Sequence, residues 1–459
     1  MERFGKAEIR LCPRCRNKVS RSDGFFCYGL SLEQIVKEVK EFDADAVGIT
    51  VAYSSQFEVV SELCSKIKLL SKDITTVIGG THPTFLAKQC LEYNRDIDFI
   101  LLGEGERSFP ELIEKLNNDA GLDDIDGLGF RRGYETVVNP QQKLIMDVDS
   151  IPFPARDMLD LEKYKKIRFP MGLVWKQSPI INMITSRGCP CACSFCSSCN
   201  FWGLKFRPRS VENVLEEMQV LKDMGYRELK FFDDNLTLDS KRAKEIFKGM
   251  IDRKFNFTWS TPNGVAVQTL DEEMIRLMKQ SGCFELALAI ESGDKYILKN
   301  VVRKPIDLDK ALDTAEIIRK YGINTLGFFM IGFPGETKQQ VLNTLDYMKK
   351  LKTDRVSLFI VNPLPGTWIY ECCKEKGLFD DGKLSVMTLD YFHSPVNLSE
   401  VASDELETIR RNTFFLYNIS LFFRSPLKFF RIWHKFIFMR PLLLIKMLIG
   451  KMIKPIIFK

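Results

Sequence analysis

The sequence has little that would place the protein outside a reducing cell interior. Its N-terminus shows none of the pattern of a secretory signal, and thirteen cysteines are spread over 459 residues. Disulfides are rare in reducing compartments, so we expect a cytoplasmic protein whose cysteines are thiols or metal ligands. The isolated cysteines are expected to be small buried apolar residues: Cys64, Cys90, Cys283, Cys372 and Cys373.

Acidic residues are absent after Glu407, although this tail holds 11 of the 66 lysines and arginines. That leaves 55 basic residues against 60 acidic ones in the preceding part, which is therefore mildly acidic. A nucleic-acid partner is not expected for such a body. The content of 45% hydrophobic and 27% charged residues is typical of a globular protein, and the length suggests two or three domains.

The C-terminal tail, residues 398–459, lacks an uncharged run as long as a membrane span. It has a helical pattern from about Ser403, and over 426–459 basic residues recur every few positions among large apolar ones. A basic amphipathic segment of this kind can lie on the anionic inner face of a membrane. The alternative is a helix packed on the protein, with its lysine and arginine stems covering apolar surface. We favour the peripheral membrane contact.

Residues 1–28 form an atypical N-terminal segment. Cys12, Cys15 and the later Cys27 resemble part of a zinc knuckle, but no matching second pair follows. We assign this segment no function.

A regular alternation of strands and helices begins at residue 29. Ser31 can cap a helix, and apolar segments at 46–51, 75–79 and 97–102 alternate with helical patterns. This order predicts a doubly wound, Rossmann-like parallel sheet over 29–125. Parallel strands bring their carboxyl ends to one edge, where we expect ligand contacts. The candidate residues are Ser54, Gly79, Gly80, His82, Thr84, Gly103, Glu104 and Glu106. For His82, a hydrogen bond to a local carbonyl group is an equal alternative.

Three cysteines follow a strand-like apolar segment at 180–184: Cys189, Cys193 and Cys196. Thiolates are the usual ligands of iron–sulfur clusters, and three of them leave one iron of a cubane cluster open for a small molecule. A tetrahedral zinc site is the alternative, with Cys191 or Cys199 as the fourth ligand.

Five more strand-like segments follow the cysteines, and each ends in a polar or glycine-rich cluster. Six such units predict a partial (β/α)6 barrel over 175–397, with every cluster at one mouth around the cysteines. A zinc knuckle explains none of this arrangement, so it favours the iron–sulfur interpretation. The five segments are 228–235, 257–264, 285–293, 325–336 and 355–367.

The cysteine spacing and the strand ends resemble the radical S-adenosylmethionine (SAM) superfamily. In that family the three cysteines hold a [4Fe-4S] cluster whose open iron chelates SAM, and Phe195 matches the aromatic position beside the adenine. The resemblance implies further SAM contacts at Asp233, Asp234, Glu291, Ser292, Gly293, Gly332, Pro334 and Gly335. Taken singly, these residues have alternatives: a salt bridge to a neighbouring helix for Glu291, and a plain turn before a helix for Pro334-Gly335.

The N-terminal half resembles the cobalamin-binding domain that is fused to many radical SAM proteins. Its GGTHPT loop at 79–84, its GEGE loop at 103–106 and a linker over 126–174 match that family. The first strand and helix of such a domain are not recognisable before Gly29, so we expect a shortened domain. An Asp-x-His-x-x-Gly motif is also absent, so no histidine is expected to replace the lower base of cobalamin.

The resemblance implies an enzyme that cleaves SAM reductively to a 5′-deoxyadenosyl radical. The implied cofactors are the cluster, SAM and cobalamin, and the implied electron donor is a flavodoxin or a ferredoxin. The expected reaction is methyl transfer to an unactivated carbon of a hydrophobic small molecule. The alternatives are a cyclase-like oxidation, as in anaerobic porphyrin cyclases, and a non-catalytic protein that binds cobalamin or a metal.

Overall fold

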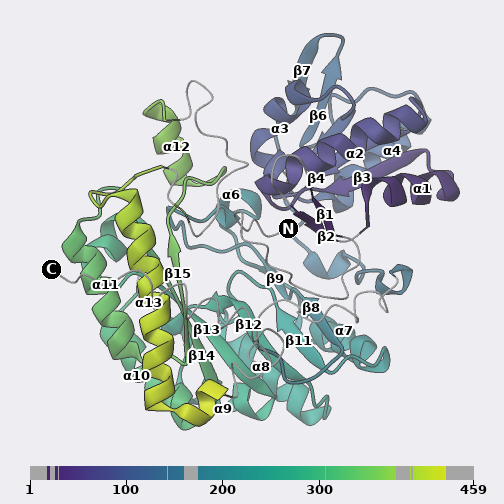
Figure 1. Cartoon of the computed structure of the whole chain (residues 1–459). Coiled ribbons are helices and arrows are strands. Elements are labelled where there is room, and N and C mark those ends of the chain that lie inside the picture. Colours follow the sequence, from purple (N-terminus) through teal and green to yellow (C-terminus); the bar gives the residue numbers. More distant parts are fainter. Residues whose placement is uncertain are drawn as a thin grey trace.

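The chain folds into two α/β bodies that lie next to each other (Figure 1). The computed structural model describes residues 18–20, 26–28, 30–141, 143–159, 174–304, 306–378, 393 and 396–430. Cys12 and Cys15 lie outside these residues, and so does the side chain of Cys27. The strands β1 (Lys18–Ser20) and β2 (Phe26–Tyr28) pair antiparallel with each other.

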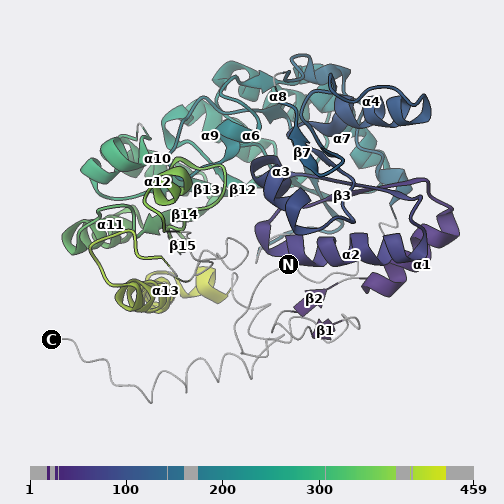
Figure 2. The same ribbon diagram turned by 90° about the horizontal axis from the view of Figure 1, so that it is seen from above.

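The N-terminal body is built on a five-stranded sheet. Its first three strands are parallel and adjacent, which confirms the Rossmann-like prediction: β3 (Ala46–Thr50), β4 (Thr75–Gly79) and β5 (Phe99–Leu101). Four helices accompany them: α1 (Leu32–Phe42), α2 (Phe57–Leu70), α3 (Thr81–Tyr93) and α4 (Gly105–Asn117). Apolar side chains of α2 and α3 pack on one face of the sheet and those of α4 on the other, while α1 lies against α2 (Figure 2). The sheet is therefore doubly wound.

Two features of this body differ from the sequence-based expectation. The sheet continues past residue 125, because β6 (Leu128–Arg132) and β7 (Glu135–Val138) form a hairpin that adds antiparallel to β5. The last four residues of the GGTHPT segment, Thr81–Thr84, form the first turn of α3 and not a loop. Proline is tolerated in a first helical turn, and the Thr84 hydroxyl donates to the carbonyl group of Gly80 at 2.7 Å, which stabilises that turn.

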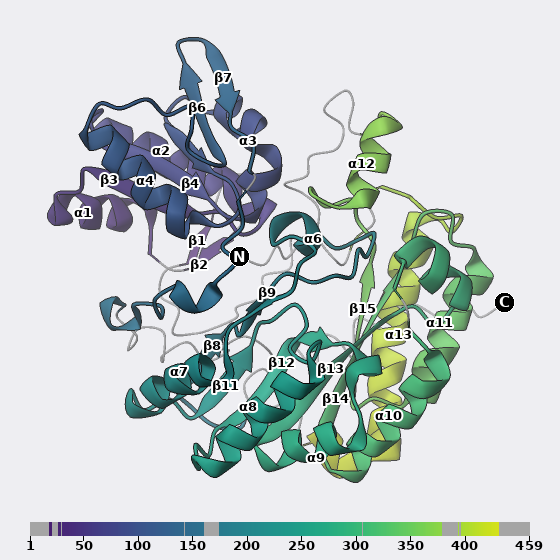
Figure 3. The same ribbon diagram turned by 180° about the vertical axis from the view of Figure 1, so that it is seen from behind.

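The second body is an open barrel of six parallel strands, as predicted. The strand order is β15-β14-β13-β12-β11-β8, and helices cover its outer side (Figure 3). The strands are β8 (Ile180–Met183), β11 (Glu228–Phe231), β12 (Thr258–Val265), β13 (Cys283–Glu291), β14 (Asn324–Ile331) and β15 (Arg355–Ile360). The outer helices are α7 (Val211–Asp223), α8 (Ser240–Asp252), α9 (Glu272–Gln280), α10 (Leu308–Lys320) and α11 (Lys338–Leu351). The carboxyl ends of all six strands therefore share one mouth.

A long C-terminal helix, α13 (Ser403–Arg424), packs against the barrel beside β15. Leu406 is 1% exposed and joins the barrel core, and the hydroxyl group of Tyr417 donates to the Thr353 carbonyl at 2.8 Å. The packed-helix alternative thus applies to residues 403–424, whereas 431–459 lie outside the described residues. Over the part of the chain that the structure describes, no helix has the length and apolarity needed to span a bilayer.

Replacing Leu406 with alanine tests whether α13 is part of the barrel. We expect the Leu406→Ala variant to lose about 2–5 kcal/mol of unfolding free energy, because the substitution leaves a cavity in the core. Leu427, which is 82% exposed, supplies the control, and Leu427→Ala should change stability by less than about 0.5 kcal/mol. Equal effects of the two substitutions in chemical denaturation would show that α13 is not packed in this way.

Candidate functional site

The cysteines are carried by a two-stranded ribbon at the mouth of the barrel. Its arms are β9 (Ser186–Arg187) and β10 (Arg207–Pro208), which pair antiparallel with Arg187 opposite Arg207. Gly188 begins the loop with a φ of +83°, and a β-carbon there would lie 2.2 Å from the Lys205 carbonyl oxygen. Only glycine allows the two sides of the loop to approach so closely. The base of the cysteine loop is therefore narrow and fixed.

A buried carboxylate holds this ribbon to the barrel. Asp233, at the end of β11, accepts hydrogen bonds at Oδ1 from the hydroxyl groups of Thr185 (2.7 Å) and Ser186 (2.6 Å). It also accepts one from the backbone N–H of Thr185 at 3.1 Å. Burial raises the pKa of Asp233, although these hydrogen bonds act in the opposite direction. Asp233 is only 2% exposed. Its described contacts are thus with the ribbon, which leaves little surface for the SAM contact expected from the sequence.

The three cysteines lie along the loop as free thiols. Cys193 is buried, whereas Cys189 and Cys196 are half-buried. Burial raises the pKa of Cys193 to about 12, and a hydrogen bond with Cys191, followed by burial, raises that of Cys189. Thiols give up their protons when they bind a metal, so iron would have to displace protons here.

The zinc and the iron–sulfur interpretations place different demands on these sulfurs. A structural zinc ion needs four ligands around one point. A four-iron cluster binds each cysteine to a separate iron. Among the described residues, no three Cys, His, Asp or Glu side chains form a group that could hold one metal ion.

A lysine that the sequence analysis did not single out lies next to the cysteines. Lys304 Nζ donates to Glu291 Oε1 at 2.8 Å and to the Ala289 carbonyl at 2.7 Å, and its side chain is only 10% exposed. Burial opposes its charge, but the Glu291 carboxylate outweighs that effect and raises the pKa of Lys304. Glu291 has a φ of +71°, a left-handed conformation that is unusual for a residue with a β-carbon. Glu291 therefore forms an ion pair, as its alternative interpretation expects, but the partner Lys304 lies in a connecting segment and not in a neighbouring helix.

Asp234 points toward the cysteine loop, unlike its neighbour Asp233. Its Oδ1 accepts a hydrogen bond of 2.7 Å from the hydroxyl group of Ser198, which begins the short helix α6 (Ser198–Phe201). Burial raises the pKa of Asp234, and burial, with a smaller contribution from the negative charge of Asp234, also raises the pKa of Cys196. The structure thus places this predicted residue beside the cysteines.

The glycine-rich turn after β14 is held by a carboxylate beneath it. Glu336 Oε2 accepts from the N–H groups of Gly332 (2.6 Å) and Phe333 (3.1 Å), while its buried Oε1 has no hydrogen-bond partner among the described residues. These two N–H groups are therefore not available to an adenine ring. The ring centroid of Phe195 lies 6.3 Å from that of Phe333, so the cysteine loop and this turn do meet.

The remaining predicted SAM residues differ in what they face. Ser292 is fully buried, and its hydroxyl group lies 3.0 Å from that of Thr344 on α11. The N–H of Gly293 donates to the same Thr344 oxygen at 3.0 Å. Pro334 and Gly335 lie nearer the surface in the turn, as their alternative interpretation expects.

The strand-end residues of the N-terminal body are linked to one another. The N–H of Gly103 donates to the Thr84 hydroxyl at 2.9 Å, which joins the GEGE loop to the start of α3. His82 Nδ1 lies 2.9 Å from the Ser54 hydroxyl group, and burial lowers the pKa of His82 to about 4. The local partner of His82 is thus a hydroxyl group and not a carbonyl. Gly80 lets α3 start close to β3, because a β-carbon there would lie 2.9 Å from the Val51 carbonyl oxygen.

Glu104 and Glu106 reach across to the barrel. Glu104 Oε1 accepts from Arg187 Nη1 at 2.6 Å, its Oε2 accepts from Arg207 Nη1 at 2.8 Å, and Glu106 pairs with Arg187 as well. Both acidic residues were expected to contact cobalamin, but in the described structure their carboxylates pair with the ribbon. The ribbon lies between the two bodies in two opposite views (Figures 1 and 3). The cysteine loop and the strand ends of the N-terminal sheet therefore adjoin.

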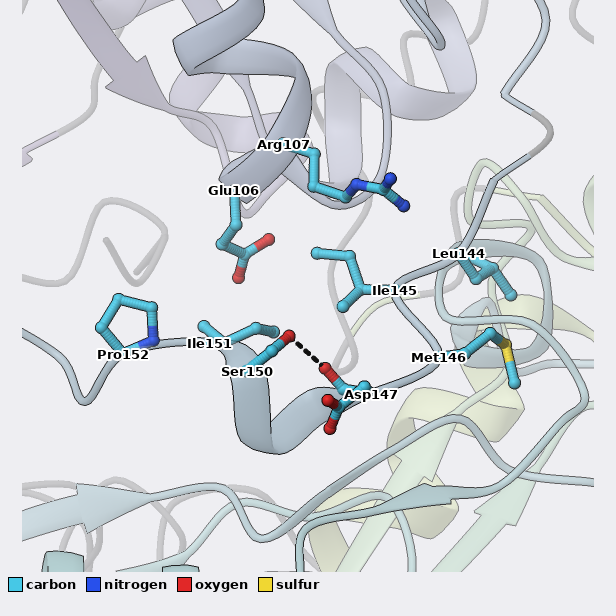
Figure 4. Close-up of a pocket in the computed structure, with 9 residues that line it drawn as sticks. All are labelled: Glu106, Arg107, Leu144, Ile145, Met146, Asp147, Ser150, Ile151 and Pro152. Atoms are coloured by element: carbon cyan, nitrogen blue, oxygen red, sulfur yellow. Dashed lines mark hydrogen bonds between the residues drawn. The ribbon is translucent and has the colours of Figure 1, made fainter.

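A cavity of about 480 Å³ opens beside this contact (Figure 4). Glu106 and Arg107 extend into it from the start of α4, and residues 144–152 of the linker form the opposite wall. The linker side is mainly apolar, with Leu144, Ile145, Met146, Ile151 and Pro152. None of the predicted SAM contacts is among the residues that line this cavity.

Two residues central to this geometry had no recognisable sequence signal. Lys304 follows Glu291 by thirteen positions, and Arg207 follows Cys196 by eleven. Glu336 was expected only as part of the strand end at 332–336 that contacts SAM, and its position beneath the turn was not predicted. A partner across a domain boundary or under a turn has no fixed spacing in the sequence, so such residues become visible only in the fold.

Comparison with known proteins agrees with this geometry. The family description "Radical SAM superfamily" matches residues 183–348, and "B12 binding domain" matches residues 21–113. Cytidylyl-2-hydroxyethylphosphonate methyltransferase of Streptomyces wedmorensis is 33% identical over 408 residues, which span 83% of this chain and 76% of the relative. The anaerobic magnesium-protoporphyrin IX monomethyl ester cyclase of Rubrivivax gelatinosus is 27% identical over 367 residues, or 78% of this chain and 64% of the relative.

The fold is also found in a solved structure. The cobalamin-dependent S-adenosylmethionine radical enzyme OxsB, with aqua-cobalamin and S-adenosylmethionine bound, superimposes with a TM-score of 0.69 at 17% identity. The match covers 90% of this chain and 65% of that chain. At this identity the similarity establishes a shared fold.

The buried carboxyl group of Glu336 predicts a pH-dependent stability. Burial raises its pKa from 4.5 to about 7, so the unfolded chain releases this proton first as the pH rises. The stabilisation is therefore complete below pH 4.5 and is lost as the pH rises through 7. Relative to Glu336→Gln, the wild type should lose about 3 kcal/mol between pH 4.5 and pH 8 in urea denaturation. Glu316→Gln, at a side chain that is 77% exposed, is the control, and an equal pH dependence of wild type and Glu336→Gln would refute the assignment.

Proposed function

Because this chain belongs to the radical SAM proteins that carry a cobalamin-binding domain, we propose that it transfers a methyl group to an unactivated carbon of a hydrophobic small molecule. It is an enzyme whose cofactors are a [4Fe-4S] cluster, SAM and cobalamin. We take the cobalamin-binding domain to run from about residue 29 through the hairpin that ends at Val138. The radical SAM domain then spans about 175–397.

The observation that carries this proposal is the meeting of two strand-end edges. The cysteine ribbon at the mouth of the barrel contacts the GEGE segment of the N-terminal sheet through Arg187, Arg207 and Glu104. Ligands of open α/β sheets bind at the carboxyl ends of the strands. Cofactors held at these two edges would therefore lie next to each other, as a reaction that uses both of them requires.

Several of the predicted site residues have a role in this proposal. Cys189, Cys193 and Cys196 hold the cluster, and Phe195 packs beside the adenine. Glu291, oriented by Lys304, accepts hydrogen bonds from the ribose or the amino group of SAM. When bound, the reduced cluster supplies the electron that breaks the SAM sulfonium, and cobalamin supplies the methyl group. Asp233 holds the ribbon and does not contact SAM.

A second candidate is a cyclase-like radical oxidation of the substrate, favoured by the similarity to the porphyrin-ester cyclase. The two reactions differ in their products. Methyl transfer adds one carbon to the substrate, whereas ring formation removes hydrogen atoms from it. Mass spectrometry of the product separates them, and a loss of hydrogen without added carbon would exclude the methyltransferase.

Cofactor content gives the first test of the proposal. Protein purified anaerobically, reconstituted with iron, sulfide and hydroxocobalamin and then desalted should hold about four irons and one cobalamin per chain. Cys193→Ala should lose most of the iron and should no longer form 5′-deoxyadenosine from SAM with dithionite. Cys372→Ala is the matched control, because this cysteine lies outside the loop and should leave both cofactors in place.

The outcomes of this test point to different conclusions. Iron that stays bound in Cys193→Ala, or SAM cleavage by that variant, would refute the cluster assignment. Iron without cobalamin in the wild type would remove methyl transfer and leave only SAM cleavage. Cobalamin without SAM cleavage would favour the non-catalytic alternative.

We further propose that a flavodoxin or ferredoxin reduces the cluster and that the C-terminal end contacts an anionic membrane surface. The support for the membrane contact is the exposure of three apolar side chains, Phe423 (77%), Leu427 (82%) and Phe430 (51%), in a tail without acidic residues after Glu407. Apolar area combined with positive charge favours such binding.

Vesicle binding tests the membrane contact. The full chain should co-sediment with vesicles that contain phosphatidylserine, and much less with vesicles of phosphatidylcholine alone. Phe423→Ser combined with Leu427→Ser should weaken this binding several-fold, since the exposed apolar area is lost. Phe42→Ser, at an 82% exposed site on α1, is the control. Equal binding to the two lipid mixtures, or no binding, would refute the proposal.

A further inference from the structure

We propose that Glu104 is a positioning residue that fixes the cysteine loop relative to the cobalamin-binding domain. This inference rests on the proposed function, because it concerns the distance between the two cofactors. Glu104 was expected to contact cobalamin, but its carboxylate faces the base of the cysteine loop. The Glu104 carboxylate connects both arms of the ribbon to the GEGE segment.

The carboxylate is fully engaged by the ribbon and the linker. Glu104 Oε1 accepts from Arg187 Nη1 (2.6 Å) and Arg207 Nη1 (2.9 Å). Glu104 Oε2 accepts from Arg207 Nη1 (2.8 Å) and from the backbone N–H of Ile145 (2.9 Å). The side chains of Glu104 and Arg207 are each 1% exposed. Four hydrogen bonds in a water-excluded position give this carboxylate a single orientation.

The two arginines extend the same contact into the loop. Arg207 Nη1 donates to the Ile145 carbonyl at 2.6 Å, and its Nη2 donates to the Trp202 carbonyl at 2.8 Å. The guanidinium group of Arg187 lies 4.9 Å from the centroid of the Trp202 ring, within reach of a cation–π interaction. Trp202 belongs to the cysteine loop itself. A shift of Glu104 would therefore move both ends of the loop and Trp202 within it.

The charges explain why the carboxylate is needed. Arg187 and Arg207 lie opposite each other on the ribbon, and their like charges repel at short range. Glu104 lies between them, and Glu106 adds a second carboxylate that pairs with Arg187. Without the charge of Glu104, the buried guanidinium group of Arg207 has no carboxylate partner among the described residues. The ribbon would then relax away from the cobalamin-binding domain.

The decisive measurement is the magnetic coupling between the two cofactors. In protein loaded with cobalamin and the cluster, pulsed electron paramagnetic resonance reports the interaction of the reduced cluster with paramagnetic cobalt. The wild type should give one narrow coupling, because the ribbon has a single position. Glu104→Gln, which keeps the shape and removes the charge, should weaken or broaden this coupling at least twofold.

A matched variant separates positioning from general destabilisation. Glu285 also forms a buried ion pair, with Arg355 at 2.6 Å, but within the barrel and away from the ribbon. Glu285→Gln should lower the unfolding midpoint and leave the cofactor coupling unchanged. Arg207→Lys, which keeps the charge and loses the forked geometry, should resemble Glu104→Gln. An unchanged coupling in Glu104→Gln, with both cofactors bound, would overturn the inference.

A second measurement keeps the inference testable if cobalamin or the cluster does not bind. Amide hydrogen exchange of the unloaded chain should be about tenfold faster at Ile145 and along the ribbon in Glu104→Gln than in the wild type. Glu285→Gln should leave these amides unchanged. Absence of the cofactors in the wild type would thus refute the proposed function, whereas unchanged exchange in Glu104→Gln would refute the positioning role.

Discussion

Two buried carboxylates hold the ribbon that carries the cysteines, and the rest of the site depends on them. Asp233 holds the start of β9 to the barrel through hydrogen bonds, and Glu104 holds both arms of the ribbon to the N-terminal sheet through ion pairs. A buried charge is costly unless it is paired, so each carboxylate fixes its partners in one arrangement. The ribbon can therefore hold reactive groups at a defined place between two domains that are joined by a linker.

Much of the architecture could be predicted because it depends on local pattern. The alternation of apolar segments and helices gave the doubly wound sheet and the six-stranded barrel, and strand ends placed the candidate residues at the correct edges. The hairpin of β6 and β7 was missed because its sequence was interpreted as a linker motif. The first turn of α3 was interpreted as a loop because Gly79 and Gly80 before it and Pro83 within it are typical of turns.

The direction of a side chain at a strand end was much harder to predict. Asp233 and Asp234 are neighbours with the same functional group, yet one faces the ribbon and the other the cysteine loop. Sequence position shows that both lie at the mouth of the barrel, but their partners come from segments more than thirty residues away. The same limit applies to Glu104, whose partners lie in the other domain, and to Glu291, whose partner is Lys304.

The interface between the bodies also bears on how a bulky cofactor enters. If a molecule of the size of cobalamin enters between the two bodies, the contacts of Glu104 with Arg187 and Arg207 must open first. Charges that separate into water regain their hydration, so this opening costs less than removing one partner of the buried pair would. Entry and release of the cofactor would then both require the same contact to open.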